Sequence, residues 1–235
     1  MSATLDAAAY ERLREAATTG RERLVVRLAG EAGVRPAEQT RLRPGDIDRR
    51  RFEGESHHFL SVRGEDDEPA RRTYLSADLA RAIDEYAATT GTDPNGRLID
   101  VTPRRVQMLI NEVADRAAES TGNGRFDDVS SDDLRRYFAR RLLTETDVDP
   151  RVVRAVGGWD RLAALDPYVG EVEDADIAAA FADGHRPAIA ADDGPSFDDA
   201  ASVVALELDA DGRVVGCSGA PEPLLGYADD SVPGT

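Results

Sequence analysis

Three short β-like runs stand together in the sequence, and helical patterns fill most of the chain around them. The runs cover residues 47–52, 58–62 (HFLSV) and 72–75 (RTYL), and the turn sequence GEDDEPA separates the last two. A chain that groups its strands in one place and its helices elsewhere is typical of an α+β domain. We therefore expect a mainly helical domain with a small three-stranded antiparallel sheet.

Helices are predicted by apolar periodicity and by residues that suit helix ends. Residues 7–32 fit two helices interrupted by Thr-Thr-Gly. Thr102 can cap a long helix that starts at Pro103, and Ser130 can cap the helix that begins SDDLRRYF. Further helices are predicted at PAEQTRL, SADLARAIDEYAA and PRVVRAV, and a last one at about residues 174–181.

The charge of the chain is strongly negative but unevenly spread. The sequence holds 46 acidic residues against 29 basic ones, all of which are arginine, for a net charge of -17. Residues 161–235 carry a net charge of -13, whereas residues 1–160 carry only -4. An acidic, lysine-free composition resembles that of halophilic proteins, and in molar salt the Debye length is only about 3 Å. The net charge therefore does not exclude a DNA partner.

The composition narrows the class of protein further. No apolar run approaches the roughly 20 residues that span a bilayer, and the N-terminus lacks the features of a signal peptide. Cys217 is the only cysteine, and His57 and His58 point to opposite faces of a strand. We therefore expect a cytoplasmic protein with no membrane segment, no disulfide, no metal site and no cofactor.

An arginine-rich stretch covers residues 131–169 and reads SDDLRRYFARRLLTETDVDPRVVRAVGGWDRLAALDPYV. Two Arg-Arg pairs lie on one predicted helix, and Gly-Gly-Trp and a single tyrosine follow. Like charges repel, so such a cluster needs either nearby carboxylates or an anionic partner. Two interpretations are open: the arginines bind an anion, or Arg136, Arg140 and Arg141 pair with Asp132, Asp133 and Glu145.

The order of these segments resembles the catalytic domain of the tyrosine recombinases, the phage integrase family. The resemblance covers about residues 7–182 and rests on GVRPAE, the three β-like runs, DLRRYF, GGWD and PYV. It implies that Arg35 and Arg135 are the two catalytic arginines, Trp159 the His/Trp position and Tyr168 the nucleophile. It also implies DNA as the partner, with the DNA-binding arginines Arg35, Arg135, Arg136, Arg71 and Arg72.

The chemistry of these residue types fits the implied roles. Two guanidiniums can hold a scissile phosphate through charge-assisted hydrogen bonds. The indole N–H can donate to a phosphate oxygen, and the tyrosine hydroxyl can attack phosphorus to form a phosphotyrosine. A structural interpretation stays open beside this one, in which Arg35 and Arg135 form salt bridges, for instance with Glu38, and Trp159 and Tyr168 are core aromatics.

The sequence also departs from the family pattern. Asp132 stands where the family has histidine, and Glu65 stands where it has the hairpin lysine. Arg71 and Arg72 are near, but a guanidinium does not release a proton in the working pH range. Each lost proton-transfer partner costs about 10²–10⁴-fold in rate. We therefore expect strand cleavage to be impaired. Because the first family motif begins about 30 residues into the sequence, we also expect this chain to lack the family's N-terminal core-binding domain.

The end of the chain has a second resemblance. Residues 200–235 resemble the opening of a PAS sensor domain, and residues 183–199 are a polar, acidic linker by composition. Together with a first domain over residues 1–182, this resembles halophilic-archaeal regulators of the bacterio-opsin-activator type. The prediction is a non-catalytic DNA-binding module of a sensory transcription regulator, with a homodimer formed through the PAS-like region. The alternative is an active tyrosine recombinase.

Overall fold

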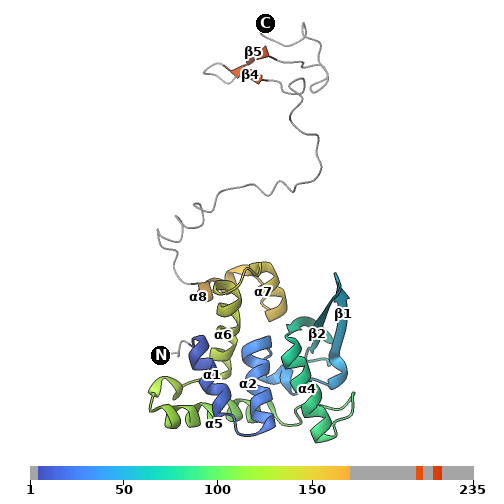
Figure 1. Cartoon of the computed structure of the whole chain (residues 1–235), viewed down its shortest axis with the longest axis vertical. Helices are drawn as coiled ribbons and strands as arrows, with labels where there is room; N and C mark the ends of the chain where they lie inside the picture. The colour runs from blue at the N-terminus through green and yellow to red at the C-terminus, as the bar shows by residue number, and fades with distance from the viewer. Residues whose placement is uncertain (1–4, 170–204, 209–213, 219–235) are drawn as a thin grey trace. The chain divides into compact units, whose positions relative to one another are not determined.

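The computed structural model describes residues 5–169, 205–208 and 214–218, and the chain divides into two units, residues 1–171 and 172–235. Over its described residues, 5–169, the first unit contains eight α-helices, three 3₁₀ turns and one sheet. Figure 1 shows how most of these elements are arranged. In chain order these are α1 Ala7–Ala16, α2 Gly20–Ala32, α3 Pro36–Gln39, η1 Pro44–Asp46, β1 Ile47–Phe52, β2 Glu55–Arg63, β3 Pro69–Leu75, α4 Ala77–Thr90, α5 Pro103–Thr121, η2 Gly124–Phe126, α6 Ser131–Thr144, α7 Pro150–Gly157, η3 Leu162–Leu165 and α8 Asp166–Val169.

The predicted helix starts are confirmed. Thr102 caps α5 by accepting a hydrogen bond from the Arg105 amide at 3.2 Å, and Pro103 is its first residue. Ser130 and Asp133 form a reciprocal capping box at the start of α6. Capping depends on neighbours in sequence, which is why the chain alone predicts it.

The sheet is antiparallel with the strand order β1-β2-β3, as expected. Strands β2 and β3 are longer than the predicted runs at 58–62 and 72–75, because pairing extends toward the two hairpin turns. Residues alternate between the faces, so Leu60, Thr73 and Leu75 are buried against the helices while Tyr74 is exposed. The Thr73 hydroxyl donates to the Ala32 carbonyl at 3.0 Å, which ties β3 to the end of α2.

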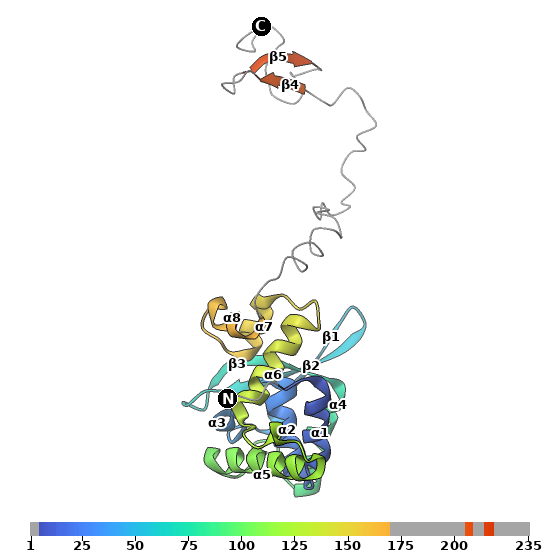
Figure 2. The same cartoon turned by 90° about the vertical axis from the view of Figure 1, so that its left-hand side faces the viewer.

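The core is built around α2, which packs against α1, α4, α5 and α6 (Figure 2). Val25 and Leu28 of α2 are fully buried, as are Ile83 of α4 and Leu134 of α6. Burying side chains of this size stabilises the fold by about 1.5–3 kcal/mol each. Because α2 is central, the loop that follows it at Gly33 is held in a fixed place.

The second unit is described only in two short strands. Strands β4 Ala205–Leu208 and β5 Val214–Ser218 pair antiparallel. The helix predicted at 174–181 and the linker predicted at 183–199 lie outside the described residues, so the proposed domain boundaries stay a prediction. Among the residues that the structure describes, no helix is long and apolar enough to cross a membrane.

Candidate functional site

The structure brings together Arg35, Arg135 and Trp159, although they are far apart in sequence. Arg35, just before α3, donates from Nη2 to the Gly158 carbonyl at 2.8 Å. Arg135 of α6 donates from Nη1 to the Gly33 carbonyl at 3.2 Å. Its guanidinium carbon also lies 4.3 Å from the centre of the Trp159 ring. One small region therefore holds two guanidiniums and one indole.

Tyr168 completes this group from α8, which packs against α6. The centres of the Trp159 and Tyr168 rings are 5.6 Å apart, with the rings tilted by 56°. Both side chains are half-buried, so neither belongs to the buried core. The tyrosine thus lies within one side-chain length of the arginine–tryptophan stack.

Arg71 reaches the same region from the inner face of β3. Its Nη2 and Nε donate to the Glu38 carboxylate at 2.8 and 3.3 Å, and Nη2 also donates to the Gly33 carbonyl at 3.1 Å. Its Nη1 donates to the Val156 carbonyl. The side chain is only 9% exposed. Arg71 therefore links α3, the end of α2 and the end of α7, and most of its donors are already used.

Two glycines in left-handed conformation present the carbonyls that hold the arginines. Gly33 has φ 64°, and a Cβ there would lie 2.6 Å from the Phe138 ring. Gly158 has φ 70°, and a Cβ there would lie 2.6 Å from Cδ of Arg71. A side chain is unfavourable at both positions because of the backbone angle and the close neighbour. In the sequence, Gly33 directly follows the helical pattern of residues 7–32, and Gly158 stands out only as part of Gly-Gly-Trp.

The site is electrostatically incomplete. Burial, with the nearby positive charges of Arg35 and Arg71 acting in the same direction, lowers the pKa of Arg135 to about 10. A lowered arginine pKa means that the positive charge is unfavourable in this environment. A bound anion would relieve that cost, so the cluster is suited to hold one.

A cavity of about 430 Å³ opens beside the cluster. Its two carboxylates are those of Glu38 and Asp160. The Glu38 carboxylate is already occupied, since it accepts from Arg71 and from the Arg35 backbone amide at 2.7 Å. The lining residues are Arg35, Glu38, Ala70, Arg71, Arg154, Ala155, Gly158, Trp159 and Asp160.

Two of the predicted DNA-binding arginines lie elsewhere. Arg72 is on the outer face of β3, where it pairs with Asp48 at 2.7 Å and stacks over Phe59. Arg136 pairs with Asp133 at 2.9 Å, as the structural interpretation had it. Of the predicted set, Arg35 and Arg71 therefore line the cavity and Arg135 stacks on Trp159 beside it, whereas Arg72 and Arg136 have other partners.

Among the described residues, the other salt bridges of the structural interpretation do not form. Arg35 contacts Glu38 through its backbone amide, and no salt bridge joins the two side chains in the part of the chain that is described. Within that same part, Arg140 and Arg141 form no ion pair with Asp132 or Glu145.

The two positions that depart from the family pattern, Glu65 and Asp132, are both exposed, and neither lines the cavity. The chain has no lysine, and neither His57 nor His58 lines the cavity either. No group of three metal-ligating side chains occurs among the described residues.

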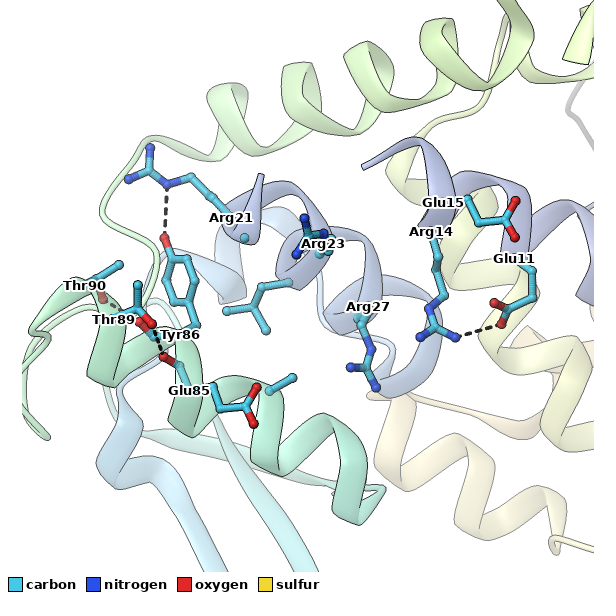
Figure 3. Close-up of a pocket in the computed structure, with 13 residues that line it drawn as sticks. Glu11, Arg14, Glu15, Arg21, Arg23, Arg27, Glu85, Tyr86, Thr89 and Thr90 are labelled. Atoms are coloured by element: carbon cyan, nitrogen blue, oxygen red, sulfur yellow. Dashed lines mark hydrogen bonds and ion pairs between the residues drawn. The ribbon is translucent and has the colours of Figure 1, made fainter. Parts of the chain in front are cut away.

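A different hollow of about 660 Å³ lies between α1, α2 and α4 (Figure 3). Its arginines are largely held by their surroundings. Arg14 binds Glu11 at 2.8 Å, and Arg27 binds Glu31 at 2.8 Å and Asp78 at 2.7 Å. No residue of this hollow belongs to the arginine–tryptophan cluster, so we place the functional site at the smaller cavity.

An α+β fold in which two arginines, a tryptophan and a tyrosine meet beside a cavity defines the class: it is that of a tyrosine-recombinase catalytic domain. The family model described as "Phage integrase family" matches residues 3–173. The match covers more than half of the chain, and the chain belongs to this family.

Solved structures show the same fold. XerA recombinase superposes with a TM-score of 0.60 at 21% identity, covering 80% of this chain and 65% of that one. XerH site-specific recombinase bound to difH substrate superposes with a TM-score of 0.60 at 18% identity, and the match covers 76% of this chain and 53% of that one. The Tn1549 transposon integrase in complex with circular intermediate DNA superposes with a TM-score of 0.62 at 15% identity, and the match covers 77% of this chain and 65% of that one.

This chain therefore spans between about half and two thirds of the length of those proteins. At these identities the likeness concerns the fold. A comparison with curated proteins found no significant match.

Proposed function

We propose that the first unit binds DNA by holding a backbone phosphate between Arg35 and Arg135, with the Trp159 N–H as a further donor. One observation carries this proposal: the two guanidiniums converge beside a cavity while the hydrogen bonds they make go to backbone carbonyls. A carbonyl does not neutralise a guanidinium, so the charge is left for an anion. Guanidinium groups bind phosphate oxygens with charge-assisted hydrogen bonds.

The comparisons support DNA as the source of that phosphate. XerH recombinase was solved bound to its difH substrate, and the Tn1549 integrase was solved with circular intermediate DNA. Those facts belong to those proteins, and we transfer only the expectation that this domain uses the same surface. The nearly balanced charge of residues 1–160 does not oppose it.

We further propose that this unit binds DNA but cleaves it very slowly or not at all. Attack by the Tyr168 oxygen on phosphorus requires a proton acceptor for the tyrosine and a proton donor for the leaving sugar oxygen. No lysine or histidine lines the cavity, and arginine does not serve as a donor in the working pH range. Two missing proton transfers slow the reaction by about 10⁴–10⁸-fold if they act independently.

An active tyrosine recombinase is the second candidate, and the position of Tyr168 favours it. A tyrosine 5.6 Å from the Trp159 ring is close enough to reach a phosphate held at the arginine pair. In that case the tyrosine oxygen forms a bond to phosphorus while the bond from phosphorus to the leaving sugar oxygen breaks.

The regulatory part of our proposal rests on the resemblance of residues 200–235 to the start of a PAS domain. We infer that the DNA-binding unit is one module of a sensory transcription regulator, which can dimerise through that region. The family match ends at residue 173, so it neither supports nor opposes this step.

A cleavage assay separates the two candidates. Nicked duplexes of randomised sequence trap a covalent adduct if Tyr168 attacks, because the released short strand diffuses away. We expect DNA binding without an adduct in the wild type. An adduct that disappears in Tyr168→Phe would establish the active enzyme, and absence of DNA binding would contradict both candidates.

A further inference from the structure

We propose that Arg154 is a third phosphate-binding arginine at this cavity, and that it contributes a contact with the DNA backbone beyond those of Arg35 and Arg135. This inference rests on the proposed DNA-binding function. Arg154 belongs to no motif in the sequence, and only the fold places it at the site.

The local backbone fixes Arg154 beside the rest of the site. Helix α7 ends at Gly157, and the left-handed Gly158 reverses the chain so that the Trp159 amide donates to the Arg154 carbonyl at 3.0 Å. Arg154 and Trp159 therefore start from adjacent points of the backbone. Both side chains line the 430 Å³ cavity together with Arg35.

The Arg154 guanidinium has few partners. Among the described residues it makes one hydrogen bond, from Nη1 to the Asp160 carbonyl at 3.3 Å, and its buried Nε has none. Polar atoms that are buried without a partner are unfavourable, so each one calls for an explanation such as an absent ligand. The missing partner of this side chain is an anion at the cavity.

In the described part of the chain, the buried Nε atoms of Arg43 and Arg141 also lack a partner, but neither residue lines this cavity. Two arginines close to Arg154 are in a different state. Arg71 uses its donors on Glu38 and on two carbonyls. Arg151, one turn earlier on α7, binds the Asp149 carboxylate at 2.6 Å through Nη2. Arg154 differs from both because its one contact is a long bond to an uncharged oxygen.

The charge balance of the cavity selects the ligand. Three arginines line it and Arg135 stands behind Trp159, against two carboxylates, of which Glu38 is occupied. The Asp160 carboxylate is on an exposed residue, and Arg154 binds the Asp160 carbonyl. A ligand with several anionic oxygens fits this balance, and a DNA strand offers one such group per nucleotide.

The test compares Arg154→Gln with Arg151→Gln by measuring duplex DNA binding between about 50 and 200 mM salt. Arg151 is a matched control because it lies on the same helix and carries the same charge, but has its own carboxylate. We expect Arg154→Gln to weaken binding several-fold at low salt and to make the salt slope shallower by about 0.9, the value for one phosphate contact. Arg151→Gln should leave the slope unchanged.

Further variants keep the outcome unambiguous. Arg154→Lys retains a positive charge that can bind phosphate, so it should keep the wild-type salt slope. Arg154→Met has no charge, so its slope should be as shallow as that of Arg154→Gln. Thermal melting checks that each variant is folded. The inference is overturned if Arg154→Gln behaves like Arg151→Gln while Arg35→Gln still loses affinity. If the wild-type protein does not bind DNA at all, the proposed function fails, and this inference fails with it.

Discussion

The hollow between α1, α2 and α4 and the cavity beside Trp159 are both lined by arginines, and they differ in the partners of those arginines. In the hollow between α1, α2 and α4, Arg14 and Arg27 are paired with carboxylates, as Figure 3 shows for Arg14 and Glu11. The other two arginines of this hollow bind uncharged oxygens: Arg21 donates to the Tyr86 hydroxyl, and Arg23 donates to backbone carbonyls. At the cavity beside Trp159, the side chains of Arg35 and Arg135 bind backbone carbonyls. The second hollow therefore keeps its positive charge, although the chain as a whole is strongly acidic.

The difference teaches how to distinguish structural from ligand-binding arginines in such a protein. A guanidinium paired with a carboxylate stabilises the fold and presents no net charge. A guanidinium oriented by a carbonyl is held in place but stays charged, and burial then lowers the pKa, as for Arg135. The number of arginines in a hollow and their distance from one another do not distinguish structural arginines from ligand-binding ones.

The largest expected effect concerns the glycines that shape the site. Gly158→Ala should lower the free energy of unfolding by about 3 kcal/mol, because a left-handed alanine and a Cβ that overlaps Arg71 are each unfavourable. Gly20→Ala is the control in the other hollow, where a Cβ would lie 3.4 Å from the Tyr86 ring. It should change stability by less than about 0.5 kcal/mol in urea unfolding. Equal effects would contradict the described packing.

A crossed pair of substitutions tests the comparison itself. Arg27→Gln removes the nearest cation from the mostly buried Glu31, which keeps the Tyr10 hydroxyl at 3.1 Å and Arg14 at 3.7 Å. We therefore expect a loss of about 1–2 kcal/mol in unfolding free energy and unchanged DNA affinity. Arg35→Gln should do the reverse, with about tenfold weaker DNA binding and stability within about 0.5 kcal/mol. If Arg27→Gln weakened DNA binding as much as Arg35→Gln, the division between the hollows would be wrong.

Inorganic phosphate should distinguish the two hollows without DNA. If phosphate binds between Arg35 and Arg135 as we propose, it stabilises the folded state by about 1.4 kcal/mol when its concentration is tenfold above the dissociation constant. We expect the melting temperature to rise with phosphate in the wild type and in Arg21→Gln, which alters the other hollow. The rise should be absent in Arg135→Gln. Sodium chloride at equal ionic strength is the control.

The smallest expected effect is a pH dependence at Arg135. The pKa of about 10 in the folded state lies well below that of arginine in the unfolded chain, so the folded state holds this proton less tightly. The resulting destabilisation is fully present at neutral pH and is relieved as the pH rises above about 10. Relative to Arg135→Gln, the wild type should gain less than about 1 kcal/mol between pH 8 and 10.5. A relative loss over this range would contradict the lowered pKa.

The sequence predicts the parts of this structure that depend on near neighbours. The starts of α5 and α6 follow from Thr102, Pro103 and Ser130, since a cap bonds to an amide two or three residues away. The positions of the strands follow from their β-branched and aromatic residues. Their lengths do not, because the ends of β2 and β3 are held by pairing with a partner strand.

The site was predictable in part, for the same reason. Arg35, Arg135, Trp159 and Tyr168 could be selected because they match a family pattern in order and spacing. Side chains alternate between the two faces of β3, so Arg71 lies on the same face as the buried Thr73 and Leu75, and Arg72 lies on the other face. This alternation can be read from the sequence of the strand. The role of Glu38 as the partner of Arg71, and the position of Arg154, depend on contacts across many residues of chain. No local signal carries that information.

The most direct measurement is the salt dependence of DNA binding by Arg35→Gln/Arg135→Gln beside the wild-type protein. If these two arginines hold one backbone phosphate between them, the double variant loses about one phosphate contact. The slope of log affinity against log salt should then be shallower by about 0.9, the value for one contact. Tyr168→Phe should keep the wild-type slope, because its hydroxyl carries no charge. A double variant with the wild-type slope would show that DNA binds elsewhere on the molecule, and our assignment of the site would be wrong.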